Sequence, residues 1–304
     1  MMHRRDFLRF GAGATLLAAG GRALALSRPP ARALIPSTGV TIARIGLGTW
    51  RTFDVGSDAK QRAQRAEVLK LFVAFGGDVV DTSPMYGSSP AVLGDLIAQD
   101  AGLRDGLFLA TKVWTSGREA GEEQMEGQLR QLRTDRVELM QVHNLVDWRT
   151  QLTTLRRWKE QGRARHIGIT HYLPSAVDDL ARIVKSEKID FVQFALSLQE
   201  PLAAERLLQV CADRGVAFIA NRPFAEGAAF ERVRGKALPP WAAELDITTW
   251  AQFLLRWILA HPEVTCAIPA TTNPSHAAEN LSAACGSALD PVQRDRLAAH
   301  WRTL

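Results

Sequence analysis

Eight short apolar runs alternate with eight helix-like windows, and this alternation restricts the possible folds more than any other feature of the chain. The strand-like runs are a segment around Gly46, then Gly77–Asp81, Leu107–Val113, Val137–His143, His166–His171, Phe191–Leu196, Val216–Asn221 and Thr265–Pro269. The helical windows lie near residues 60–75, 90–100, 119–133, 149–161, 174–186, 201–214, 247–261 and 274–284. Such alternation is typical of a parallel sheet with crossover helices, so we predict an α/β fold, and eight repeats close it into a single (β/α)8 TIM barrel.

Two further segments flank the predicted barrel. Ala33–Pro36 and Val40–Ala43 surround Ser37-Thr38-Gly39, which predicts an N-terminal β-hairpin with a three-residue turn. Residues Pro291–Trp301 predict an amphipathic C-terminal helix. The chain has 304 residues, of which 46% are hydrophobic, and this suffices for one barrel of about 250 residues. Two smaller domains would fit the same length and composition.

The first 25 residues are typical of an export signal. The pair Arg4-Arg5 is followed by Phe7-Leu8, a short apolar Gly/Ala-rich run, and the cleavage-site pattern Ala23-Leu24-Ala25. This stretch resembles a twin-arginine signal, which implies the twin-arginine export machinery as a partner, folding in the cytoplasm before export, and a periplasmic or otherwise exported protein. The apolar run is too short for stable membrane insertion. We assign residues 26–33 to a linker and residues 34–304 to the barrel.

Charge and cysteine content exclude two classes of function. Removal of residues 1–25 takes away four arginines and one aspartate, so the formal charge falls from +5 to +2. No basic stripe with interleaved aromatic residues remains, so we expect no nucleic-acid partner. Cys211, Cys266 and Cys285 are widely spaced and form no C-x-x-C pair, so we expect no metal site. We expect a monomer.

Four ionisable residues lie at or just after the ends of three successive predicted strands: Asp81 and Tyr86, then Lys112, then His143. Active sites of barrel enzymes form at this end of the strands. A phenol is a weak acid, and we expect the Lys112 charge to lower the pKa of Tyr86, with Asp81 holding Lys112 charged. His143 would donate a hydrogen bond to a carbonyl oxygen. These groups together predict proton delivery to a polarised carbonyl.

Five motifs in this order resemble the aldo-keto reductases over residues 34 to 290. They are Gly46-Leu47-Gly48-Thr49-Trp50, Asp81-Thr82-Ser83 with Tyr86-Gly87, Thr111-Lys112, Gln141-Val142-His143, and Ile268-Pro269 with Glu279-Asn280. The resemblance implies a barrel that binds an extended nicotinamide dinucleotide without a Rossmann domain. It also implies a catalytic tetrad of Asp81, Tyr86, Lys112 and His143, with Tyr86 as general acid and base.

The resemblance also implies positions for cofactor and substrate. Those implied for the cofactor are Gly48, Thr49, Trp50, Asp81, Thr170, His171, Gln193, Asn221, Arg222, Pro223, Phe224, Ile268, Pro269, Ala270, Thr271, His276, Glu279 and Asn280. Those expected around the substrate are Trp50, Tyr86, Trp114 and His143. Asn221 replaces an aromatic residue of the family, and Ala270 and His276 replace its lysine and arginine ligands of a 2′-phosphate. We expect NADP as the cofactor, with NAD as the alternative.

These features predict an oxidoreductase that transfers hydride between a nicotinamide and a small carbonyl or alcohol substrate. The alternative is a cofactor-binding sensor or partner subunit on the same fold with little turnover. The departures at His171, Asn221 and Arg222 favour altered chemistry. Export complicates the enzyme hypothesis, because the periplasm is not expected to supply reduced nicotinamide.

Overall fold

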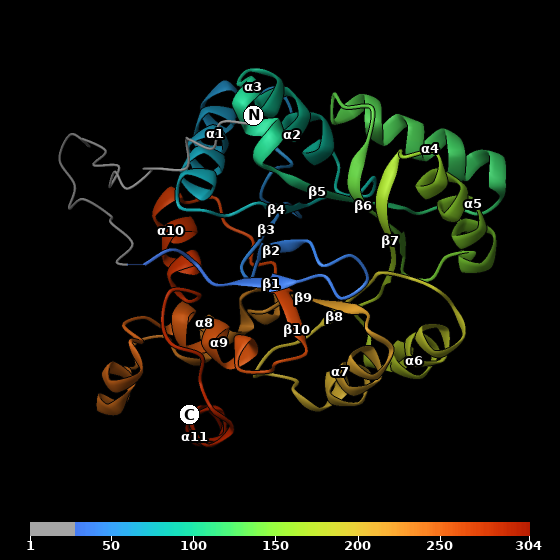
Figure 1. Cartoon of the computed structure of the whole chain (residues 1–304). Helices are drawn as coiled ribbons and strands as arrows, with labels where there is room; N and C mark the ends of the chain where they lie inside the picture. Colours follow the sequence, from blue (N-terminus) through green and yellow to red (C-terminus); the bar gives the residue numbers. More distant parts are fainter. Residues whose placement is uncertain (1–27) are drawn as a thin grey trace, which may run out of the picture.

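Eight parallel strands form the centre of the molecule, in a computed structural model that describes residues 28–304 (Figure 1). The predicted leader, residues 1–25, lies outside the described residues. The strands are β3 (Leu47–Gly48), β4 (Val79–Asp81), β5 (Phe108–Val113), β6 (Val137–His143), β7 (Ala164–Thr170), β8 (Phe191–Ala195), β9 (Ala217–Asn221) and β10 (Val264–Ala267). They pair in sequence order, each parallel to the next. The predicted (β/α)8 architecture is confirmed.

The edge strands β3 and β10 meet and close the sheet. Parallel bridges join Ile45 to Ala267 and Gly48 to Ala270, and the Gly46 amide donates to the Ala267 carbonyl at 2.8 Å. A Cβ atom at Gly48 would lie 3.0 Å from the Ile268 carbonyl oxygen, and one at Gly46 would lie equally close to Val79 and Ile268. The two glycines therefore permit the close backbone approach that this seam needs.

Helices cover the outside of the barrel. They are α1 (Ala59–Ala74), α2 (Ser89–Ala98), α3 (Ala101–Gly106), α4 (Arg118–Gln131), α5 (Trp148–Glu160), α6 (Val177–Ser186), α7 (Leu202–Arg214), α8 (Ala228–Arg232), α9 (Trp250–Leu259), α10 (Pro274–Ser282) and α11 (Pro291–Thr303), with short 3₁₀ segments at Pro174–Ala176, Ala225–Gly227 and Pro240–Leu245. Each predicted helical window holds a helix. α3, α8 and two of the 3₁₀ segments, Ala225–Gly227 and Pro240–Leu245, were not predicted.

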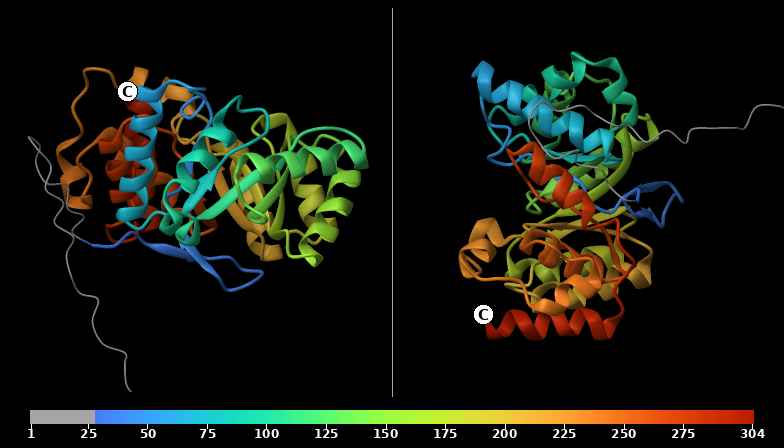
Figure 2. Two further views of the ribbon diagram at one scale, coloured as in Figure 1. Left: turned by 90° about the horizontal axis from the view of Figure 1, so that it is seen from above. Right: turned by 90° about the vertical axis from the view of Figure 1, so that its left-hand side faces the viewer.

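The N-terminal hairpin closes the bottom of the barrel. Its strands are β1 (Arg32–Leu34) and β2 (Thr41–Ala43), paired antiparallel (Figure 2). Ile35 and Ile42 are buried and pack with the apolar side chains inside the barrel. The Ile35 amide donates to the Val40 carbonyl at 2.8 Å, so the turn runs over residues 36–39. The predicted three-residue turn is thus one residue too short, because Pro36 belongs to the turn.

Two connections at the opposite end of the barrel differ in length. The one after β6 is short, whereas the one after β9 carries α8 and the 3₁₀ segment Pro240–Leu245 before α9 begins. Helix α11 packs on α9. Arg232 and Lys236 of the long connection donate to carbonyls at the C-terminal end of α11.

Cys211, Cys266 and Cys285 are free thiols. Across residues 28–304, every helix is too short or too polar to cross a bilayer.

Candidate active site

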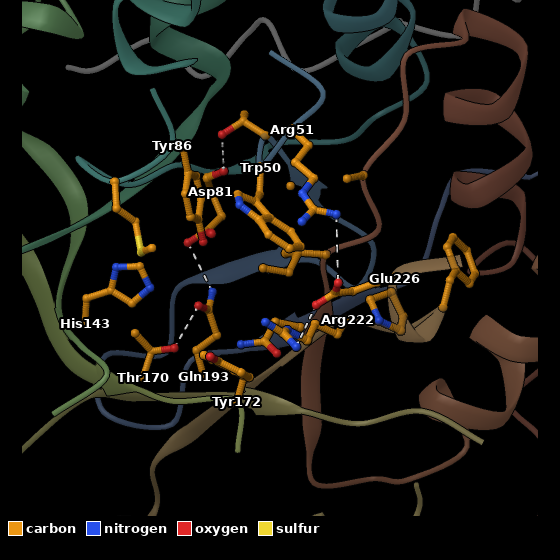
Figure 3. A pocket seen from close by; sticks show the side chains of 18 of the residues that line it. Trp50, Arg51, Asp81, Tyr86, His143, Thr170, Tyr172, Gln193, Arg222 and Glu226 are labelled. Atoms are coloured by element: carbon orange, nitrogen blue, oxygen red, sulfur yellow. Dashed lines mark hydrogen bonds and ion pairs between the residues drawn. The ribbon is translucent and has the colours of Figure 1, made fainter. Parts of the chain in front are cut away.

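A cavity of about 450 Å³ opens at the carboxyl end of the strands (Figure 3). It is lined by Gly48, Thr49, Trp50, Arg51, Asp81, Met85, Tyr86, His143, Asn144, Thr170, His171, Tyr172, Gln193, Asn221, Arg222, Pro223, Phe224, Glu226, Gly227, Phe230, Ile268 and Ala270. The volume is in the range of small-molecule sites. Most of the residues predicted from the sequence therefore meet in one hollow.

The floor of the cavity holds a buried ion pair between neighbouring strands. Lys112 of β5 donates to the Asp81 carboxylate of β4 at 2.6 Å and to the Thr82 carbonyl at 2.7 Å. Lys112 is fully buried and does not line the cavity, so it acts from behind Tyr86. Burial is the largest single influence and would lower the pKa of Lys112, but the Asp81 carboxylate and the Tyr86 phenol together outweigh it and raise the pKa above its ordinary value. Lys112 is therefore charged.

Tyr86 lies in the loop after β4, beside this ion pair. Its amide donates to the Ser83 carbonyl at 3.0 Å, and the following Gly87 has a φ of 57°, so a tight turn presents the phenol to the cavity. Lys112 Nζ lies 4.9 Å from the centre of the phenol ring. Burial raises the pKa of Tyr86, and the charge of Lys112 lowers it by less. The expected net lowering is therefore wrong, because it ignored burial.

His143 ends β6 and approaches Tyr86 from the side. Its ring lies edge-on to the phenol with 6.0 Å between the centres, and its Nδ1 is 2.8 Å from Ser83 Oγ. Burial, together with the charges of Lys112 and His171, lowers the pKa of His143 to about 2. The imidazole is neutral, so it can donate one hydrogen bond into the cavity without carrying charge.

Gln193 of β8 joins the ion pair to the opposite wall of the cavity. Its amide nitrogen donates to Asp81 Oδ1 at 3.1 Å, and its oxygen accepts from the Thr170 hydroxyl at 3.0 Å. Gln141, which is also buried, points its amide nitrogen at the same carboxylate oxygen at 3.4 Å. An amide fixed at both ends in this way presents a defined set of donors and acceptors to a ligand.

Asn221, at the end of β9, leaves an oxygen without a partner. Its amide nitrogen donates to the His171 carbonyl at 3.3 Å, while its Oδ1 is buried and accepts no hydrogen bond from residues 28–304. The His171 side chain is turned to its own backbone, since Nδ1 accepts from the amides of Tyr172 and Leu173. The cavity wall here is thus a polar acceptor at the position where the resemblance would place an aromatic ring.

Arg222 follows Asn221 and is held by two neighbours. Its guanidinium lies 3.7 Å from the centre of the Tyr172 ring, and it pairs with Glu226 at 2.7 Å. Glu226 also lies 4.0 Å from Arg51, on the loop after β3. Arg222, Ala225 and Glu226 all have positive φ, between 47° and 57°. This strained turn brings charged groups from two loops together at the cavity mouth.

Some predicted residues lie outside the cavity lining. Trp114 is at the rim, 42% exposed, with its ring centre 6.3 Å from that of His143. Besides Lys112, described above, the other residues outside are Pro269, Thr271, His276, Glu279 and Asn280, which lie after β10 and on α10. The N-terminus of α10 is capped by Asn273, whose side chain accepts from the Ser275 amide. The roles of these residues remain predictions.

Seven lining residues were not predicted from the sequence: Arg51, Met85, Asn144, Tyr172, Glu226, Gly227 and Phe230. Arg51, Asn144 and Tyr172 each directly follow a predicted site residue. Adjacency to a predicted site residue was therefore a signal that could have found these three. Glu226 and Phe230 belong to the long connection after β9, where only the folded turn shows which side chains face inward.

Comparison with known proteins agrees with this geometry. The model of the aldo/keto reductase family matches residues 44–302. Methylglyoxal reductase YeaE of Escherichia coli is 26% identical over 250 residues, covering 80% of this chain and 86% of that protein. Methylglyoxal reductase DkgB of Salmonella typhimurium is 26% identical over 251 residues, covering 80% and 88%. An aldo-keto reductase of Klebsiella pneumoniae in complex with NADPH superposes with a TM-score of 0.74 at 25% identity, covering 86% and 92%.

Proposed function

The chain belongs to the aldo/keto reductase family, and from that premise we propose that it is an NADP(H)-dependent oxidoreductase acting on a small carbonyl or alcohol. The observation that carries the proposal is the convergence of Asp81, Tyr86, Lys112 and His143 beside one cavity. The similarity to two methylglyoxal reductases supports a small aldehyde or ketone as the substrate. The likeness to a structure in complex with NADPH supports the cofactor.

The cavity residues fit a nicotinamide carboxamide. The Gln193 amide and the Thr170 hydroxyl form one polar edge, and the unpartnered Oδ1 of Asn221 forms another that an N–H donor would satisfy. When bound, the nicotinamide supplies or accepts the hydride. Asn221 offers no aromatic face, so the ring would be held at this wall by hydrogen bonding instead of stacking.

The chain's own residues move the proton. Tyr86 holds its proton at neutral pH, because a phenol has an ordinary pKa of about 10 and burial raises it further, so in reduction it can donate to the carbonyl oxygen. The Lys112 charge stabilises the phenolate as it forms, and Asp81 keeps that charge in place. His143 donates a hydrogen bond to the same oxygen and orients it. In alcohol oxidation Tyr86 takes the proton back.

The choice between NADP and NAD depends on the region after β10. The exposed His276 stands where the family has an arginine ligand of a 2′-phosphate, and Ala270 stands where it has a lysine. A single imidazole binds phosphate less firmly than the fixed fork of a guanidinium. We favour NADP. The measurement is mass spectrometry of the nucleotide released when purified protein is denatured, and release of NAD alone would overturn this choice.

Substitution of Tyr86 by Phe tests the catalytic proposal. With methylglyoxal and a panel of small aldehydes, we expect NADPH oxidation to fall by at least about 100-fold. Thermal stabilisation by NADPH should remain, because the ring and its packing are kept. Equal rates for the two proteins would contradict the enzyme proposal. Binding of NADPH without turnover in either protein would support the alternative, a sensor or partner subunit.

We also propose that the protein is exported after folding, as the Arg4-Arg5 leader predicts. The double substitution Arg4→Lys and Arg5→Lys should keep the full-length protein in the cytoplasm, whereas the parent chain should appear outside it, shortened near Ala25. Cell fractionation with mass spectrometry of the N-terminus measures both. An unchanged distribution would contradict export by this route.

A further inference from the structure

Ser83 connects the loop that carries Tyr86 to the strand that carries His143. It lies after β4, is fully buried, and places its Oγ 2.8 Å from His143 Nδ1. It does not line the cavity. Among the catalytic side chains, the Ser83 hydroxyl therefore contacts the His143 imidazole alone within residues 28–304.

The hydrogen-bond partners of Ser83 decide which way this contact runs. The Met85 amide points at Ser83 Oγ at 3.4 Å and uses the hydroxyl oxygen as its acceptor. Within residues 28–304, His143 Nδ1 is the acceptor within reach of the Ser83 proton. If Nδ1 carried the hydrogen instead, Oγ would accept from two N–H groups and its own proton would have no acceptor. Counting protons thus makes Ser83 the donor and Nδ1 the acceptor.

We propose that Ser83 is a positioning residue that fixes His143 in its Nε2–H tautomer, so that the remaining ring proton points into the cavity beside Tyr86. A neutral imidazole has one N–H, and the bond made by one nitrogen decides which nitrogen carries it. Nε2 has no partner among the described residues, so it is available to a ligand. The depressed pKa of His143 agrees with a neutral ring.

The catalytic consequence rests on the proposed function. With Nε2 protonated, a carbonyl oxygen in the cavity meets two donors, the Tyr86 hydroxyl and His143 Nε2–H. With Nδ1 protonated, Nε2 would present a lone pair to that oxygen and repel it. By fixing the tautomer of His143, Ser83 would therefore favour substrates that place an acceptor oxygen beside Tyr86 and His143, although Ser83 itself does not contact the substrate.

Histidine ¹⁵N spectra test the tautomer without any assay of activity. In the parent protein labelled at histidine, the His143 signals should report an unprotonated Nδ1 and a protonated Nε2. Replacement of Ser83 by Ala should give a mixture of tautomers, and Ser83→Thr, which keeps the hydroxyl, should restore the parent spectrum. Ser89→Ala is the matched control, because Ser89 is equally buried but donates to the Thr49 carbonyl, so the His143 signals should not change.

Kinetics then test the consequence for the reaction. Loss of one hydrogen bond of ordinary strength should lower kcat for carbonyl reduction by roughly 5- to 10-fold in Ser83→Ala, and Ser83→Thr should recover most of it. A protonated Nδ1 in the parent protein, or a His143 spectrum that Ser83→Ala leaves unchanged, would overturn the proposal. Absence of turnover in the parent would count against the proposed function alone, since the spectra would still report the tautomer.

Discussion

The Lys112 ammonium and the Asp81 carboxylate lie 2.6 Å apart, and their side chains are 0% and 2% exposed. Each charge is therefore shielded from water and is stabilised mainly by the opposite charge of the other. Asp81→Asn or Lys112→Met leaves a buried charge without its partner, and each should lower the free energy of unfolding by about 3–5 kcal/mol. The double variant should lose less than the sum of the two. Urea denaturation of the four proteins measures this, and additive losses would contradict the coupling.

The raised pKa of Tyr86 predicts how turnover depends on pH. Reduction needs the phenol protonated, so kcat/KM should stay flat from about pH 6 to about pH 10 and fall only above that. Oxidation needs the phenolate, so it should rise with pH over the same range. Lys112→Met removes a charge that lowers this pKa, so oxidation at about pH 9 should suffer more than reduction. A reduction rate that falls as pH rises through neutral would count against Tyr86 as the acid, because it would report a proton donor of much lower pKa.

His143 predicts a loss of stability in acid. Its pKa is about 2 in the folded chain against 6.5 as the ordinary value, so below about pH 6.5 the unfolded chain takes up a proton that the folded chain does not. At about pH 5 this should cost about 2 kcal/mol. His143→Gln should show a shallower pH dependence in urea titrations, and a pH dependence equal to that of the parent would contradict this assignment.

At Gly94, α2 packs so closely against α4 that we expect no side chain to be tolerated there. A Cβ atom there would lie 2.0 Å from the Gln131 carbonyl oxygen, whereas one at Gly127 of α4 would meet nothing closer than 3.8 Å. Gly94→Ala should therefore destabilise the protein by about 2–3 kcal/mol, because backbone must move. Gly127→Ala should stabilise it by about 0.5–1 kcal/mol through helix propensity. Thermal unfolding measures both, and similar melting temperatures would contradict the contact.

The strands were predictable because each apolar run ends where the chain leaves the core. Asp81, Lys112 and His143 lie at or next to the ends of these strands, so their positions in the barrel could be predicted without knowing the conformation of any loop. The short helix α3 was missed, since six residues carry little periodicity. Arg222 was predicted as a cofactor-binding residue, but the sequence did not predict that it stacks on Tyr172 and pairs with Glu226. Such contacts depend on positive φ values that non-glycine residues adopt only under constraint from the rest of the fold.

The junction of β3 with β10 also sets when a binding site can exist. A ribosome releases β3 early and β10 nearly last, so the wall shared by Gly48 and Ile268 is incomplete through most of translation. A nucleotide that needs both sides of that wall can be captured only after synthesis is almost finished. If the chain is exported as proposed, a cofactor that travels with it must bind after β10 has left the ribosome and before export.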